Sequence, residues 1–414
     1  MSGRFETARK AKPPKPPREK KPRKKLQRPG WKTLLLLILN ITLAALSVLC
    51  AARLTEYRNL LRTQEAADRW RGQSEERFAQ VSVFLPVNET QDVSAVRTFR
   101  QKLDQAMIDA SLEAPEGGSL YQDAWSGTAT SVAVSGPAGK SNVKTYGVGG
   151  DFFLFHPYTL LSGAYIAETD FAQDSDVLDE TLACPLFASS DVAGMEVTIG
   201  ERNYPVAGVV RLEDDKATKK ALTDPALMFM SFDALNAIQE TKFDTYEIVM
   251  PDPISGYALS VMKDKFQLGD GVAVENSNRY SALSLAKVAL AYGERSMNTH
   301  AVIYPYWENA ARLTEDYAAL FLLLAIVLRC IQVGMKSPDY MNRLICIGIA
   351  SMLLFQILIN VGVCLGLFPV VGLALPFLSY GGSSILTSFL AMGIVSGIKM
   401  RPAPDMSAHY IRPY

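Results

Sequence analysis

Apolar residues are concentrated in four runs, one near the start of the chain and three near its end. Residues 33–52 carry no charge over twenty positions, about the ~20 residues that an α-helix needs to cross a bilayer core. The later runs cover 317–334, 344–367 and 383–398. Only Arg329 interrupts them, near an end from which its side chain can reach the membrane interface. The pattern predicts a membrane protein with about four α-helical spans.

The first run can be an uncleaved membrane anchor or the apolar core of a cleaved signal peptide. A signal peptide has a shorter apolar core, which is followed by a small-residue cleavage site. Here the run is long and continues into Arg53 and a helical pattern. We therefore expect an uncleaved anchor.

Residues 53–316 have the pattern of a folded domain inserted after the first span. A mostly polar helix follows the anchor as a stalk, and Asn88 and Gln91 have the spacing of a capping box at the start of a second helix. Short β-rich segments then alternate with turns, which predicts an α+β domain. The expected helices cover 54–82, 88–112, 179–188 and 233–240, and the expected strands cover 81–86, 128–134, 144–149, 195–200, 203–211, 227–232, 245–250 and 271–276.

The formal net charge is zero, but the charges are segregated along the chain. Residues 1–32 hold 13 Lys or Arg and 2 acidic residues, whereas residues 53–316 hold 23 Lys or Arg and 38 acidic residues. Lys and Arg that flank membrane spans stay in the cytoplasm, and the tail 401–414 is also basic. We therefore expect a multi-pass protein of the cell membrane with a cytoplasmic N-terminus and an extracytoplasmic domain over 53–316.

The basic segment 1–32 is dense in Pro and Lys, so it cannot bury a core and is expected to be disordered. It can attract anionic membrane lipid, or it can serve only as a tail that keeps the N-terminus inside. The simpler topogenic role is favoured. Nucleic acid is not an expected partner, because no aromatic residues interleave the charges between residues 9 and 28.

Composition excludes several classes of chemistry. The segregated charges and the apolar runs do not fit a cytosolic enzyme or a wholly disordered chain. Of five cysteines, only Cys184 lies in 53–316, so no disulfide framework is expected there. The three histidines are far apart in the sequence, which gives no metal site, and no cofactor is expected. A glycine-lysine pair at Gly139 lacks the earlier glycine of a phosphate-binding loop, because Val134 stands at that position.

Residues 146–210 carry a first resemblance, in the order of their turns and strands. The segment is similar to the extracytoplasmic core domain of MacB-type ABC transporter permeases, and the whole likeness spans about 30–316. In that family the domain transmits motion to or from a cytoplasmic ATPase, so the resemblance implies a separate ATPase subunit. The matching motifs are Gly163–Tyr165, Val177–Glu180, Gly194–Ile199 and Val206–Val209.

A second resemblance lies in the segment NVGVCLGLFPVVGLALPFLSYGGSS, residues 360–384. Its order of proline, small and polar residues resembles the C-terminal signature of the FtsW/RodA/SpoVE family, the SEDS peptidoglycan glycosyltransferases, and the likeness covers about 320–404. The segment either packs helices together or forms part of a groove for a polyprenyl-linked sugar, since non-helical backbone at membrane depth needs protein or water around it. The motif residues are Asn360, Pro369, Gly372, Pro376, Ser379, Tyr380, Gly381, Gly382, Ser383 and Ser384.

The SEDS resemblance implies a glycosyltransferase, but members of that family carry a catalytic aspartate in a large outer loop. No acidic residue here can be matched to it; Glu315 and Asp316 lie just before the second span without aligning to it. No catalytic residue is therefore assigned. We expect a SEDS-related envelope protein of peptidoglycan synthesis, cell division or cell shape that lacks complete catalytic machinery.

Membrane lipid and a class B penicillin-binding protein are the expected partners of such a protein. The alternative function is that of a MacB-like ABC transporter permease subunit, whose partner would be a cytoplasmic ABC ATPase. A passive adaptor without catalysis is a third interpretation, and it fits the unmatched aspartate best. The partner that copurifies with the chain distinguishes the first two.

Overall fold

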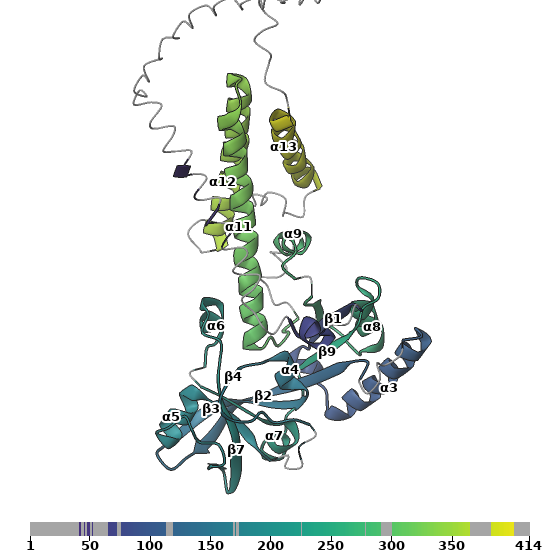
Figure 1. Cartoon of the computed structure of the whole chain (residues 1–414), viewed down its shortest axis with the longest axis vertical. Helices are drawn as coiled ribbons and strands as arrows, with labels where there is room; N and C mark the ends of the chain where they lie inside the picture. The colour runs from purple at the N-terminus through teal and green to yellow at the C-terminus, as the bar shows by residue number, and fades with distance from the viewer. Residues whose placement is uncertain are drawn as a thin grey trace, which may run out of the picture. The chain divides into compact units, whose positions relative to one another are not determined.

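A computed structural model of the whole chain defines the fold (Figure 1). The chain divides into units 1–45 and 46–414, and the elements below belong to the second unit. The structure describes residues 65–72, 76–112, 119–168, 170, 174–224, 226–277, 279–290, 300–364 and 382–400, together with a few positions within 41–52. The predicted first span at 33–52 lies almost wholly outside these residues and stays a prediction.

One mixed sheet of ten strands organises the outer domain. Its strand order is β10-β1-β9-β2-β3-β8-β5-β7-β4, and β6 pairs with β2 and β7. Two pairs are parallel, β3 with β8 and β5 with β7, and the other pairs are antiparallel. The strands are β1 (Phe78–Phe84), β2 (Gln122–Ser135), β3 (Lys140–Gly150), β4 (Thr159–Gly163), β5 (Asp176–Asp179), β6 (Glu196–Ile199), β7 (Arg202–Arg211), β8 (Leu227–Ser231), β9 (Thr245–Pro251) and β10 (Val272–Glu275).

Helices cover both faces of this sheet. On one face lie α3 (Val93–Asp109), α5 (Glu180–Phe187), α7 (Phe232–Ile238) and α8 (Tyr257–Lys265). On the other lie α2 (Ala66–Arg71), α4 (Phe152–Phe155) and the first turns of α11 (Tyr306–Lys336). The remaining elements are η2 (Val87–Glu89), α6 (Lys216–Ala221), α9 (Ala282–Leu290), α12 (Tyr340–Cys364) and α13 (Gly382–Met400).

The central strands are apolar at successive positions because both of their faces are buried. All five residues of β8 and all seven of β9 are buried. Along β8, Met228 and Met230 pack toward α5 and α7, while Leu227 and Phe229 pack toward α4 and α11. The strands predicted from β-rich segments are thus confirmed, and the α+β class of the domain is confirmed with them.

Two helix predictions at the start of the domain are wrong. The stalk helix does not reach residue 82, because α2 ends at Arg71 and β1 already begins at Phe78. The next helix begins at Val93 rather than at Asn88. The backbone of Gln91 pairs with Phe243 in an isolated β-bridge, which holds this stretch extended and prevents a helix from starting there.

Strands β4 and β5, of five and four residues, are absent from the strands predicted from the sequence. The turns of the MacB-like motif, in contrast, have the geometry that glycine allows. Gly163 has a φ of 75° and Gly194 a φ of 82°, in the left-handed region that favours glycine. Glu180, the last residue of the motif at the start of α5, accepts hydrogen bonds from Arg211 of β7 at 2.7 and 3.1 Å.

The two glycines give a matched test of this turn. A Cβ atom on Gly163 would lie 2.0 Å from the carbonyl oxygen of Ala207, whereas a Cβ on Gly194 would meet nothing within 4 Å. Gly194→Ala should therefore cost only the left-handed strain, about 1–2 kcal/mol. Gly163→Ala should lower the free energy of unfolding clearly more, because the backbone at Ala207 must also move. Thermal unfolding of the purified chain measures both, and equal losses would contradict the assigned packing.

The buried carboxyl group of Asp244, the residue just before β9, makes the stability of the domain depend on pH. Asp244 is 4% exposed, and burial raises its pKa to about 7, although the hydrogen bond from Thr245 and the charge of Lys144 act in the opposite direction. In the unfolded chain an aspartate loses its proton near pH 4. Between about pH 4 and pH 7 only the folded state holds this proton, so the free energy of unfolding falls as the pH rises.

Asp244→Asn should remove this loss of stability. The folded and unfolded pKa values differ enough to contribute at most about 4 kcal/mol between pH 4 and pH 8. Denaturant unfolding at pH 5 and pH 8 should show a decrease for the natural sequence and a smaller one for Asp244→Asn. The exposed substitution Asp233→Asn is the control and should leave the natural pH dependence in place. An unchanged pH dependence in Asp244→Asn would refute the account.

Candidate functional site

The predicted SEDS motif lies between the ends of α12 and α13. Asn360 belongs to the last turns of α12, and Gly382, Ser383 and Ser384 open α13. The side chains of these four residues and all of residues 365–381 are outside what the structure describes. The motif positions that fall within 365–381 are Pro369, Gly372, Pro376, Ser379, Tyr380 and Gly381. Their role in a substrate groove or in helix packing therefore stays a prediction.

The helices on either side of the motif are apolar and pack together. Among the described residues, α11 and part of α12 (Tyr340–Ile359) are long and apolar enough to cross a membrane, with mean hydropathies of 2.3 and 1.9 over an 18-residue stretch of each. A shorter apolar helix, Leu386–Met400, lies within α13. These apolar helices and the α+β domain make this a membrane-type protein, while the number of spans and their exact ends stay predictions.

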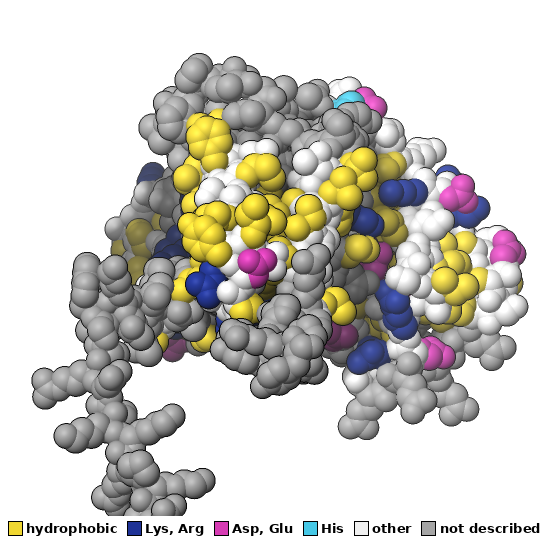
Figure 2. Space-filling view, turned by 90° about the horizontal axis from the view of Figure 1, so that it is seen from above, with side chains coloured by type: hydrophobic (Ala, Val, Ile, Leu, Met, Phe, Trp, Pro, Cys, Tyr) yellow, Lys and Arg dark blue, Asp and Glu magenta, His cyan; other side chains and the backbone are white. Residues whose placement is uncertain are grey.

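Part of the apolar surface of these helices faces away from their common core. Figure 2 shows hydrophobic side chains gathered on the described helices. Inside, α11, α12 and α13 share one core that includes Leu323, Cys330, Cys346, Leu353 and Val395. The large exposed apolar side chains on α12 and α13 include Leu344, Ile345, Ile347, Met352, Leu354, Phe355, Leu358, Leu386, Phe389, Leu390 and Ile394.

Close approach of α11 and α12 depends on a glycine. A Cβ atom on Gly334 would lie 2.8 Å from the Cβ of Cys346. Small residues at helix contacts let backbones approach closely, which favours association inside a membrane. The Cys330 thiol lies 3.7 Å from the sulfur of Met392 in α13, so the third helix joins the same contact.

Helix α11 is longer than the span predicted for this region. The apolar pattern predicts a start at 317, but the helix begins at Tyr306 and continues without a break to Lys336. Tyr306 and Trp307 are buried in the core beneath the sheet, and Leu323 and Val333 are buried in the core shared with α12. One helix therefore belongs both to the outer domain and to the apolar bundle.

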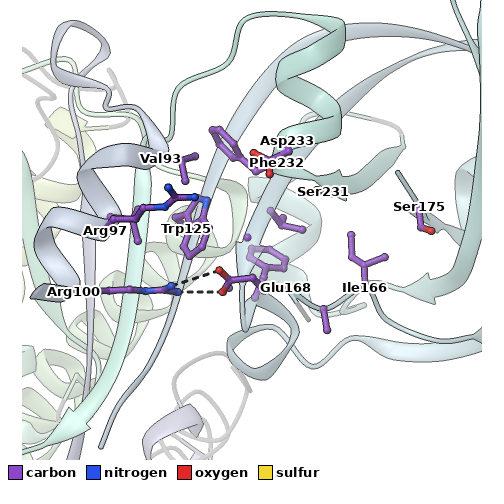
Figure 3. Close-up of a pocket in the computed structure, with 16 residues that line it drawn as sticks. Val93, Arg97, Arg100, Trp125, Ile166, Glu168, Ser175, Ser231, Phe232 and Asp233 are labelled. Carbon is purple, nitrogen blue, oxygen red and sulfur yellow. Dashed lines mark hydrogen bonds and ion pairs between the residues drawn. The ribbon is translucent and has the colours of Figure 1, made fainter. Parts of the chain in front are cut away.

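The outer domain contains a cleft of about 130 Å³ between α3, the β2–β3 hairpin and the start of α7 (Figure 3). Arg100 of α3 crosses it and lies 5.1 Å above the ring of Trp125. Its Nε and Nη2 atoms donate to the two carboxylate oxygens of Asp123 at 2.9 and 2.7 Å, and Nη2 also reaches Glu168 at 3.2 Å. Tyr246 donates a further hydrogen bond to Asp123 at 2.6 Å.

These contacts define what the cleft can do. The hydrogen bond to Asp123 raises the pKa of Arg100 above its usual value, against the effect of burial, so the guanidinium stays charged and fixed. The residues that line the described cleft include neither His nor Cys, and no group of three His, Cys, Asp or Glu side chains in the described part of the chain could hold a metal ion. The fixed guanidinium and the ring of Trp125 suit a rigid wall or a binding surface.

Glu315 and Asp316, the outer acidic residues considered from the sequence, are neighbours in α11, where Glu315 is buried and Asp316 is half-buried. Glu315 is 2% exposed and binds Arg279, so it is committed to a buried ion pair rather than to a reacting substrate. His156 is fully buried and lies 2.5 Å from Glu247. Sequence reasoning missed both pairs, because their members come from segments far apart in the chain.

Comparison with known families finds two matches in different parts of the chain. Residues 41–263 match the model of the MacB-like periplasmic core domain. Residues 317–403 match the FtsW/RodA/SpoVE model, described as a cell cycle protein. Both resemblances expected from the sequence are confirmed by these matches.

The curated relatives match shorter stretches of the chain. Stage V sporulation protein E of Bacillus subtilis is 41% identical over 80 residues, 19% of this chain and 22% of the relative. The probable peptidoglycan glycosyltransferase FtsW of Geobacter metallireducens is 44% identical over 84 residues, 20% of this chain and 22% of the relative. The FtsW of B. subtilis is 42% identical over 152 residues, 34% of this chain and 36% of the relative. The chain thus spans between about a fifth and about a third of the length of these relatives.

Two solved structures are similar to the outer part of the chain. The periplasmic region of MacB from Actinobacillus actinomycetemcomitans is 14% identical, with a TM-score of 0.36, over 49% of this chain and 92% of that one. The extracellular domain of the ABC-type transporter YknZ from Gram-positive bacteria is 13% identical, with a TM-score of 0.30, over 45% of this chain and 88% of that one.

The contact at Gly334 predicts a difference between two glycines of the apolar helices. Gly334→Leu should separate α11 from α12, because its side chain would meet Cys346, whereas nothing lies within 4 Å of a Cβ on Gly348. In detergent, Gly334→Leu should lower the thermal transition of the purified chain and Gly348→Leu should leave it nearly unchanged. Equal behaviour of the two variants would show that this helix contact is not formed.

Proposed function

The chain belongs to the family of the MacB-like periplasmic core domain, and we propose that it fixes this outer domain to membrane helices that serve peptidoglycan synthesis in the bacterial cell envelope. In this proposal the N-terminus is cytoplasmic and residues 53–316 are extracytoplasmic, in accord with the basic flanks of the predicted spans. The FtsW/RodA/SpoVE model matches the part of the chain that holds most of α11 together with α12 and α13, and the relatives named peptidoglycan glycosyltransferase suggest the process.

One observation carries the proposal. Helix α11 has its first turns in the core of the outer domain and its later turns in the core shared with α12 and α13. A helix that is continuous through both cores passes a force along its axis, since its backbone hydrogen bonds are all internal. The outer domain is thereby attached to the SEDS-like helices by regular structure rather than by a loop.

We infer that the chain does not itself polymerise the lipid-linked sugar. Glycosyl transfer needs a base for the attacking hydroxyl and charge stabilisation at the leaving pyrophosphate. Residues 344–398 contain no Asp, Glu, Lys, Arg or His that could supply either group. Glu315, just before the apolar part of α11, is buried against Arg279. A shaping or regulatory role beside a complete enzyme, with a class B penicillin-binding protein as partner, fits these residues.

The test is a polymerisation assay. The purified chain in detergent is incubated with labelled lipid-linked disaccharide and a divalent metal ion, and the products are separated on a gel. We expect no polymer, while a complete FtsW or RodA complex in the same buffer makes polymer. Polymer that depends on this chain and disappears on substitution of one outer acidic residue would restore the enzyme interpretation.

A second candidate function is that of a MacB-like permease subunit with a separate ATPase. It is favoured by the match over residues 41–263, which is longer than the match to the cell-cycle family. Isolation of the tagged chain from its own membranes distinguishes the two. Enrichment of a penicillin-binding protein supports the cell-wall role, and stoichiometric recovery of a cytoplasmic ABC ATPase favours the permease.

A further inference from the structure

Polar side chains occupy core positions on the face of the sheet that meets α11. Ser82 of β1 and Glu247 of β9 are direct partners in the antiparallel register. They are 1% and 3% exposed, on the same face as Val249 and Ala124, which pack beneath α2 and α11. A buried polar residue in a strand is costly unless every bond is made, so these positions call for a specific purpose.

The buried polar groups form one chain of hydrogen bonds with a fixed direction. Arg279 donates to the side-chain oxygen of Asn276 at 3.2 Å, and the Asn276 amide donates to Ser82 at 2.8 Å. Ser82 in turn donates to one oxygen of Glu247 at 2.8 Å. The other oxygen of Glu247 lies 2.5 Å from Nε2 of His156. A guanidinium and an amide NH₂ can only donate and a carboxylate can only accept, so the chain runs from Arg279 to Glu247.

Arg279 ends this chain in an ion cluster with α11. Its two Nη atoms donate to both oxygens of Glu308 at 2.6 and 2.7 Å, and its Nε donates to Glu315. The side chains of all three residues are 3% exposed. Burial opposes the charge, but the two carboxylates outweigh it and raise the pKa of Arg279 well above its usual value. One guanidinium thus fixes two carboxylates on α11.

Both ends of the polar chain meet the same helix. At one end, the ring of His156 lies 4.5 Å from the ring of Trp307. At the other end, Arg279 holds Glu308, the next residue of α11. The polar chain therefore contacts the first turn of α11 at two neighbouring residues, Trp307 and Glu308.

The carboxylates also mark the side of α11 that forms the apolar bundle. Glu308 and Glu315 are seven residues apart, close to two turns, and therefore lie on one side of the helix. Ile326 and Val333 lie 18 residues beyond each of them, which is five turns of about 3.6 residues. Both of these apolar residues pack in the core shared with α12 and α13.

We propose that Arg279 is a rotational key for α11, which sets from the outer domain the face that the helix presents to α12 and α13. An apolar contact tolerates sliding and rotation, whereas a two-carboxylate, one-guanidinium contact is satisfied in a single orientation. Ala311 and Ala318, both almost fully buried, leave room for the guanidinium on that side. This role goes beyond the proposed cell-wall function and holds whichever partner the chain has.

The experiment measures distances by pulsed electron paramagnetic resonance in the full chain in lipid nanodiscs, with the native cysteines replaced. Spin labels at the exposed positions Lys140, in the β2–β3 turn, and Lys336, at the end of α11, report the orientation of the helix. A second pair at Lys140 and Glu240 reports the integrity of the domain alone. We expect one narrow distance peak for each pair in the otherwise natural sequence.

Three variants separate a key from simple stabilisation. Arg279→Met leaves two buried carboxylates unpaired, and Arg202→Met, at an exposed position of β7, is the matched control. The triple substitution Arg279→Met, Glu308→Met and Glu315→Met removes the charges together, which in buried ion clusters is often neutral or stabilising. Glu315→Gln, the mildest change, keeps the pair of Arg279 with Glu308.

If Arg279 sets the orientation of α11, the narrow Lys140–Lys336 distance peak should be lost in Arg279→Met and in the triple variant. The Lys140–Glu240 peak should be retained in both. Glu315→Gln should broaden the first peak less, and Arg202→Met should change neither. A triple variant with a narrow Lys140–Lys336 peak would overturn the proposal, because apolar packing would then suffice. Broadening of both peaks in every cluster variant, Glu315→Gln included, would also overturn it, since the cluster would be part of the domain core only.

Discussion

A guanidinium buried between two carboxylates is the contact on which the junction of outer domain and membrane helices depends. Arg279 is 4% exposed, and Glu308 and Glu315 are 3% and 2% exposed. Removing one partner from such a cluster costs about 3–5 kcal/mol, because a buried charge is left unpaired. Whole domains are stable by only about 5–15 kcal/mol. This cluster therefore holds α11 firmly to the outer domain, and the attachment depends on one guanidinium and two carboxylates.

The strands could be predicted from the sequence where their apolar segments are long. Residues 227–231 and 245–251 are buried on both faces, and apolar residues dominate both stretches although Ser231 and Glu247 are polar. The errors arose where tertiary contacts override the local pattern. Gln91 has a capping-box position, but its backbone bridges to Phe243 and the helix starts later. The predicted stalk helix extends too far, because β1 carries the polar residues Gln80 and Ser82, which look solvent-facing in the sequence but are buried in the fold.

The sequence predicts a candidate site only where the site's residues are close together in the chain. The SEDS-like segment is continuous in the sequence, and the family match over 317–403 confirms the resemblance. The ion cluster joins residues 29 and 36 positions apart, in a region with many ordinary surface charges. One signal was present: Glu308 and Glu315 are seven residues apart on a helix face that otherwise carries alanines. That spacing predicts a shared side of the helix, but no local rule gives Arg279 as the partner.

Hydrogen–deuterium exchange of α11 in the full chain tests most directly whether outer domain and membrane helices share one rigid helix. If α11 is continuous from Tyr306, backbone amides of residues 310–316 should exchange as slowly as those of β9 in the centre of the sheet. These residues lie outside the predicted apolar run, so the membrane alone would not protect them. Exchange as fast as that of the exposed turn at residues 200–201 would show that the connection is a flexible linker and would contradict the account.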